Sequence, residues 1–210
     1  MSATHGFACH CATCRALFRE KYGHEMPALV TPEVEAFRTD TLIDYFTFAT
    51  DYAHACGLVN TGCIMFKPSQ GICLDSIDRL LAIPHFDNVG CDPYWCSKCD
   101  RPQEIYDYNY TRAKHAVETA EKFGKDHNVW VQGYSFPRGR EDEMIIAADA
   151  IYDAGARTIL TWSFRGGESN DYRAASTDMV WAINGEIARR LRDRYFNELL
   201  ANLRAERKDE

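Results

Sequence analysis

Two short cysteine motifs in this sequence have the spacing of metal-binding sites. A C-x-C-x-x-C motif begins at Cys9, and a C-x-x-C motif begins at Cys96. Each spacing lets two thiolates bind one tetrahedral zinc, and a closed structural zinc site needs four ligands. We therefore predict a structural zinc at the first motif, shared by the second motif if both loops lie on one rim of the fold. The predicted ligands are Cys9, Cys11, Cys14, Cys96 and Cys99.

The cysteines also allow other interpretations. An iron–sulfur cluster is one alternative, and free thiols are another. The sequence has nine cysteines, an odd number, and its start lacks the charged and apolar regions of a secretory signal. Reduced thiols or a metal site in the cytoplasm are therefore expected rather than a disulfide framework. The remaining cysteines lie in apolar surroundings typical of packing residues: Cys56, Cys63, Cys73 and Cys91.

Two carboxylates are candidates for catalysis. Asp92 comes directly after the apolar run 86–91 and before Pro93, so we expect its side chain to point away from the end of a strand. Such a carboxylate can serve as general acid, base or nucleophile. Glu168 follows a later strand, and glycoside hydrolysis usually uses two carboxylates. The alternatives are that Asp92 caps its loop and that Glu168 is a solvated loop charge.

Aromatic, amide and cationic side chains follow the same apolar runs. Aromatic faces stack on the C–H faces of sugars, while polar groups hydrogen-bond the hydroxyls. This combination predicts a carbohydrate ligand. The predicted ligand-binding residues are Lys67, Tyr94, Trp95, Gln132, Tyr134, Trp162 and Arg165.

Alternating strands and helices position these residues. After a helix that starts at Thr31-Pro32 and ends before Gly57, apolar β-branched runs alternate with segments of helical period. Short strands that alternate with helices predict right-handed crossovers and a parallel sheet. We expect strands at 58–66, 86–91, 129–134 and 158–164, and helices at 74–83, 104–123, 140–154 and 177–203.

Four strand–helix units predict an α/β fold that is half of an eight-unit (β/α) barrel. A full barrel needs about 250 residues, and this chain has 210. An open four-stranded parallel sheet is the alternative. We expect a cysteine-rich loop and helix over 1–30, the half-barrel over 31–200 and a frayed charged tail over 201–210, within one domain. Because a half-barrel leaves sheet edges unpaired, we expect a homodimer or a missing N-terminal half-barrel as partner.

The composition limits the classes of partner. Hydrophobic residues make up 46% and charged residues 26% of the chain, as in ordinary globular proteins. The net charge of −7 with scattered basic residues disfavours nucleic acid and anionic membranes as partners. No apolar run approaches the roughly 20 residues of a membrane span. A neutral polar ligand such as a sugar fits this balance.

Several motifs carry a resemblance to a known family. The stretch 9–23, C-H-C-A-T-C-R-A-L-F-R-E-K-Y-G, resembles the segment after the fourth barrel strand in β-galactosidase-type glycoside hydrolases of family 42 and their relatives. There, C-x-C-x-x-C binds a structural zinc and leads into an amphipathic helix. The motifs V-G-C-D-P-Y-W, W-V-Q-G-Y and T-W-S-F-R-G-G, which begin at residues 89, 130 and 161, look like strands six to eight of such a barrel. The resemblance implies the C-terminal half of a glycoside hydrolase TIM barrel.

The sequence departs from this family in two places. The family's general acid is a glutamate just before the cysteine motif, where this sequence starts, and its nucleophile is a glutamate where this sequence has Gln132. An amide cannot attack an anomeric carbon as a carboxylate does. The expected function is therefore a glycoside hydrolase-like protein, truncated in its catalytic barrel and nearly inactive alone. The alternative is a non-catalytic half-barrel that binds sugar or self-associates; a methyl transferase or decarboxylase barrel would need a phosphate or corrin pocket, for which no glycine-rich cradle is present.

Overall fold

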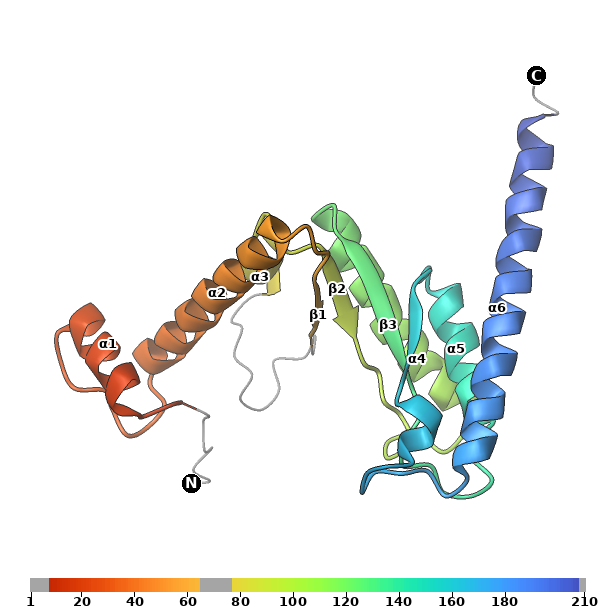
Figure 1. The fold of residues 1–210 in the computed structure, drawn as a ribbon, viewed down its shortest axis with the longest axis horizontal. Coiled ribbons are helices and arrows are strands. Elements are labelled where there is room, and N and C mark those ends of the chain that lie inside the picture. Colours follow the sequence, from red (N-terminus) through yellow and green to blue (C-terminus); the bar gives the residue numbers. More distant parts are fainter. Residues whose placement is uncertain (1–7, 65–76, 208–210) are drawn as a thin grey trace. The chain divides into compact units, whose positions relative to one another are not determined.

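The computed structural model describes residues 8–64 and 77–207 and has an α/β fold (Figure 1). The candidate Lys67 and the cysteine at position 73 lie outside the described residues. In chain order the elements are α1 (Ala12–Tyr22), α2 (Pro32–Ala55), β1 (Thr61–Cys63), α3 (Ile77–Leu81), β2 (Asn88–Cys91), α4 (Pro102–Lys122), β3 (Asp126–Gln132), α5 (Glu143–Asp153), β4 (Ile159–Trp162), the 3₁₀-helix η1 (Phe164–Gly167) and α6 (Thr177–Glu206).

The strands form one four-stranded sheet in the order β1-β2-β3-β4. Strand β4 pairs in parallel with β3, and Gln132 at the end of β3 is in register with Trp162 at the end of β4. Neighbouring order with parallel pairing is what strand–helix–strand units produce. The predicted α/β class with a parallel sheet is confirmed, and this sheet is compatible with part of a barrel.

The chain divides into two compact units. Unit 1 contains Met1–Val89 with Lys122–Asp126, and unit 2 contains Gly90–Glu121 with His127–Glu210. In the described part of the chain, none of the helices combines the length and apolar character that a membrane span needs.

A small apolar cluster joins α1 to the start of α2 in unit 1. Its buried members are Phe18, Met26, Val34 and Phe37, and Cys14 packs against them. The local sequence directs this turn of the chain, because Gly23 ends α1 in the left-handed conformation with φ of 77°. Thr31 then caps α2, and its hydroxyl accepts a hydrogen bond from the N–H of Val34. The predicted start of α2 is thereby confirmed.

The core of unit 2 contains buried side chains from its strands and from the helices α4, α5 and α6. Val129 and Val131 of β3 are fully buried, as are Ile151 of α5 and Val180 of α6. Asn128 and Gln132, on the other face of β3, are buried as well, so both faces of this strand are covered. Helix α6 continues through the stretch expected to fray, as far as Glu206.

Candidate functional site

Three tyrosines gather beside Asp92 in unit 2. The rings of Tyr94 and Tyr134 meet edge to face with their centroids 5.2 Å apart, and the ring of Tyr172 is 6.4 Å from that of Tyr134. Burial raises the pKa of Tyr134, and the nearby carboxylate of Asp92 raises it further. Asp92, Tyr94 and Tyr134 are half-buried, whereas Tyr172 is 68% exposed. We name these four residues the tyrosine site.

Strand ends and one loop position the tyrosine site. Asp92 follows β2 directly, and Tyr134 lies two residues beyond β3, so both side chains start at the carboxyl ends of strands, as predicted. Tyr172 comes from the loop after η1. Its carbonyl accepts a hydrogen bond from the N–H of Ser135 at 2.8 Å, and its N–H donates to Asn170 Oδ1 at 2.9 Å. This loop is therefore fixed against the end of β3.

The backbone of β2 lies very close to β3 at Gly90, two residues before Asp92. A Cβ at Gly90 would lie 2.3 Å from Oδ1 of Asn128, which is buried in β3. No residue larger than glycine fits without moving that amide. The position of Asp92 thus depends on the packing of β2 against β3 within unit 2.

Gln132 and Trp95 support the loop after β2 and do not present a face to a ligand. The Gln132 amide is 5% exposed; its oxygen accepts from the N–H of Cys96 at 3.1 Å and its nitrogen donates to the carbonyl of Tyr134 at 3.0 Å. Trp95 is fully buried, and its indole N–H donates to Glu143 at 3.0 Å. Both residues were expected to bind the ligand, but the structure places their polar atoms in bonds within the protein.

Arg140 completes this support. Its guanidinium donates to the carbonyls of Cys96 and Cys99 at 3.2 and 2.7 Å and forms an ion pair with Glu143 at 2.6 Å. The planar fork of arginine suits several acceptors at once. The chain segment 95–100, which follows the tyrosine site, is therefore held by side chains from the loop after β3 and the start of α5. We name Gln132, Arg140 and Glu143 the loop brace.

The remaining candidates lie around β4 and η1. Trp162 is 54% exposed and its ring meets that of Trp130 at 6.1 Å. Arg165 pairs with Asp178 of α6 at 3.0 Å and with Glu168 at 3.4 Å. These ion pairs fasten η1 to the start of α6, so Arg165 and Glu168 have a structural role in addition to any role in binding. Trp162 remains about half exposed beside Trp130.

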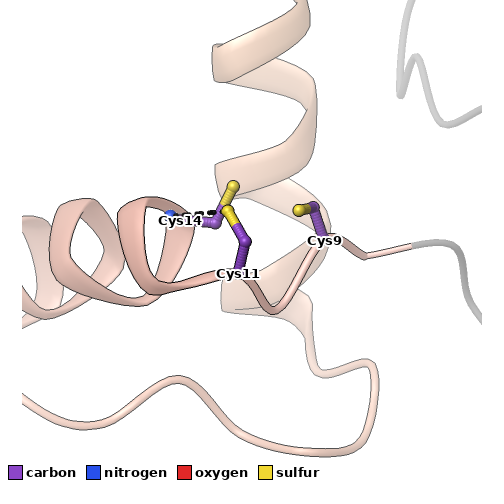
Figure 2. A group of neighbouring side chains, drawn as sticks. All are labelled: Cys9, Cys11 and Cys14. Carbon is purple, nitrogen blue, oxygen red and sulfur yellow. Dashed lines mark hydrogen bonds between the residues drawn. The ribbon is translucent and has the colours of Figure 1, made fainter.

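The three cysteines of the first motif come together, as Figure 2 shows. The sulfur atoms of Cys9, Cys11 and Cys14 all lie within 4.8 Å of one another. The turn that begins α1 brings them together, because Cys11 is its N-cap and accepts from the N–H of Cys14 at 3.5 Å. This arrangement of three soft ligands can hold a metal ion.

Hydrogen bonds and burial give these thiols unlike acidities. Hydrogen bonds, first that from the Cys14 N–H, lower the pKa of Cys11 to about 7. Burial and the neighbouring thiols raise the pKa of Cys14 to about 12. One thiolate in the group therefore opposes ionisation of the next.

Cys96 and Cys99 lie in the loop of unit 2 held by the loop brace. Cys99 is buried, and burial raises the pKa of both thiols. The Cys96 thiol donates to the carbonyl of Ser135 at 3.9 Å. In this loop the two thiols are packed against the protein. That the two cysteine motifs share one metal ion stays a prediction.

Two features of unit 2 escaped prediction from the sequence. Tyr172 lies outside the strand ends, and only the Asn170-Asp171 turn before it signals a fixed loop. Glu141, in the loop between β3 and α5, is a buried carboxylate, 5% exposed, whose Oε2 accepts from the N–H of Gly139 at 2.7 Å. The sequence predicts a helix over 140–154 that includes this position, but α5 begins only at Glu143.

The chain's relation to known proteins is distant. No family model matches it, and no curated protein is similar to it. Among solved structures, it is similar to an endo-β-1,4-mannanase from Thermotoga petrophila, with 15% identity, a TM-score of 0.46, and coverage of 73% of this chain and 40% of that one. A structure of the endo-1,4-β-D-mannanase from Thermotoga petrophila RKU-1 with maltose and glycerol gives 16% identity, a TM-score of 0.46, and coverage of 71% and 52%.

These neighbours are glycoside hydrolases, and this chain spans about half of their length or less. The similarity concerns the path of the chain over part of each protein. The particular family 42 relationship that the motifs imply stays a prediction.

Proposed function

We propose that this protein binds a carbohydrate at the tyrosine site. The observation that carries the proposal is the grouping of three tyrosine rings beside the carboxylate of Asp92 at the carboxyl ends of β2 and β3. Aromatic rings stack on the apolar faces of sugars, and a carboxylate accepts hydrogen bonds from their hydroxyls. The exposed ring of Tyr172 provides the accessible surface.

The acid–base state of the site suits a neutral ligand. The pKa of Tyr134 is raised above its ordinary value, so its hydroxyl is protonated at neutral pH and both donates and accepts hydrogen bonds. A sugar hydroxyl also does both. The site then needs no positively charged group to hold its ligand.

Binding without efficient hydrolysis is the activity we propose for the 210-residue chain. Hydrolysis usually needs two carboxylates on either side of the glycosidic bond. Gln132 is an amide and a member of the loop brace, and Glu168 is paired with Arg165. We expect purified protein to release no measurable aryl alcohol from aryl glycosides; robust turnover would contradict this part of the proposal.

Calorimetric titration with a panel of neutral oligosaccharides tests binding. Tyr172→Ala is the informative variant because that ring is exposed and its loss does not open the core. Removing one stacking face should weaken binding at least about tenfold, and Asp92→Asn should weaken it further through loss of a charged acceptor. Tyr45→Ala, on the exposed face of α2, is the matched control. Binding that is equal in Tyr172→Ala and the unaltered protein would exclude this site.

We also propose that Cys9, Cys11 and Cys14 bind a structural zinc. The mutual distances of their sulfur atoms support this, and a fourth ligand completes the tetrahedron. When bound, zinc would tie the turn before α1 to the apolar cluster through Cys14.

Elemental analysis of protein purified without chelator tests the metal. We expect about one zinc per chain, lost in Cys9→Ser and in Cys11→Ser. Cys56 and Cys63 are exposed, so the prediction that they are packing residues is wrong for both. Cys56→Ser therefore removes an exposed cysteine elsewhere in unit 1 and should leave the zinc content unchanged. Zinc-free protein would contradict the proposal.

A further inference from the structure

Helix α6 carries an apolar stripe on its C-terminal half. Five large side chains on this segment are between 40% and 54% exposed: Tyr195, Phe196, Leu199, Leu200 and Leu203. Their spacing places them on one side of the helix. Contiguous exposed apolar surface of this kind marks an interaction site in soluble proteins. We name these five residues the α6 stripe.

The opposite side of α6 is already occupied within unit 2. Arg190 pairs with Asp149 of α5 at 2.7 Å, and Glu198 accepts from the hydroxyl of Tyr152 at 2.7 Å. Arg194, between them along the helix, pairs with Asp153. These contacts fix the rotation of α6, so the α6 stripe faces away from α5. Figure 1 shows α6 continuing well past the end of α5.

A cavity adjoins the stripe and widens the apolar surface. It measures about 460 Å³ and lies between β4 and α6, with Ile159, Leu191 and Tyr195 in its lining. Tyr195 therefore belongs both to the cavity and to the stripe.

The stripe is complementary to a second copy of itself. Arg192 and Glu206 lie seven positions before and after Leu199, and seven residues return to nearly the same side of a helix. When two copies of α6 run antiparallel with Leu199 opposite Leu199, Arg192 of each copy meets Glu206 of the other, and Tyr195 meets Leu203. The Arg192 side chain is 65% exposed and forms an ion pair with its neighbour Asp193 at 3.8 Å, which the pair with Glu206 would replace.

We propose that the protein forms a homodimer through antiparallel pairing of α6 along this stripe. Self-complementarity under twofold symmetry is what an isologous dimer requires. The contact from Arg192 to Glu206 extends about 21 Å along the helix, which makes the interface small. We therefore expect a dissociation constant in the micromolar range. The interface is independent of the tyrosine site.

Sedimentation velocity over a range of about 1–200 μM tests the dimer. The unaltered protein should pass from monomer to dimer within this range, and Leu199→Glu, which sets two carboxylates face to face, should stay monomeric throughout. Leu17→Glu makes the same change at an exposed position of α1 and should dimerise normally. Helix content from circular dichroism establishes that each variant is folded. An unaltered protein that is monomeric at the highest concentration would overturn the proposal and leave the stripe to a different polypeptide.

Charge reversal tests the antiparallel arrangement. Arg192→Glu places two like-charged pairs in the dimer and should weaken it about tenfold. The double variant R192E/E206R restores opposite charges only when the helices are antiparallel, so its affinity should return to within about threefold of the original. A double variant as weak as Arg192→Glu would overturn this arrangement.

Discussion

Gly133 occupies a position at the end of β3 where a side chain does not fit. Its N–H donates to the carbonyl of Trp162 at 2.5 Å, and a Cβ would lie 2.6 Å from Cγ2 of Thr161. We expect Gly133→Ala to lower the free energy of unfolding by about 1–3 kcal/mol, because β3 and β4 would have to separate. Urea denaturation measures this change.

Gly185 is the matched control for Gly133. It lies inside α6, and no atom beyond its own stretch of helix is within 4 Å of the position that a Cβ would take. Gly185→Ala should raise the free energy of unfolding by about 0.5–1 kcal/mol, since alanine favours the helix. Equal stability of Gly133→Ala and the unaltered protein would show that the strand ends tolerate more movement than their contacts indicate.

Among the elements, the loop after β2 is held by the loop brace instead of by regular secondary structure. Arg140→Met would remove the donors to two carbonyls and leave Glu143, which is 12% exposed, without its cation. We expect a loss of about 2–4 kcal/mol in the free energy of unfolding, because desolvated acceptors then lack partners. Chemical denaturation measures the loss. Arg140→Lys keeps the charge but not the planar fork, so its stability should lie between those of the unaltered protein and Arg140→Met. A loss below about 0.5 kcal/mol in Arg140→Met would contradict the structural role of the brace.

Asp40 joins three helices of unit 1 and gives their packing a pH dependence. Its carboxylate pairs with Lys21 of α1 and, at 2.6 Å, with Arg79 of α3, and these hydrogen bonds lower its pKa. A lowered pKa in the folded state stabilises the fold above the pKa of the unfolded chain, about 3.9, and this gain disappears as the pH falls through the folded value. The side chain is 33% exposed, so screening keeps the gain below about 1 kcal/mol.

Denaturation of Asp40→Asn between pH 7 and pH 2 tests this linkage. The variant should be less stable than the unaltered protein at pH 7, and the difference should vanish at the acid end. Glu121→Gln, an exposed carboxylate of α4, is the control and should show little difference at either end. A constant difference across the range would mean that Asp40 acts through packing and not through its charge.

The order of elements could be predicted from the sequence, but the direction of side chains beyond strand ends could not. Thr31-Pro32 determines the start of α2 through local hydrogen bonding, and the apolar run Val129–Val131 marks β3 as a buried strand. Trp95 follows a strand in an irregular loop, where no period tells inside from outside. Its burial depends on Glu143, 48 positions away. Tyr172 joins the tyrosine site through similarly distant contacts with Ser135.

At the scale of the whole molecule, each of the two units contains its own set of candidate sites. The cysteine cluster and the apolar cluster beside it belong to unit 1, whereas the tyrosine site, the loop brace and the α6 stripe belong to unit 2. Each unit has its own buried side chains, such as Phe18 in unit 1 and Val131 in unit 2. Local opening of one unit then need not open the other.

Removal of the proposed zinc should affect unit 1 alone. Cys14 packs against the cluster that includes Phe18, so losing the metal releases the start of α1 from its anchor. Hydrogen exchange read by mass spectrometry should show amides of α1 and the first turn of α2 exchanging at least about tenfold faster after chelation. Amides of β3 and α5 should keep their rates, because the buried contacts of Val129 and Ile151 lie within unit 2. In Cys9→Ser, chelator should cause no further change, and faster exchange throughout both units would show that the metal stabilises the molecule as one cooperative body.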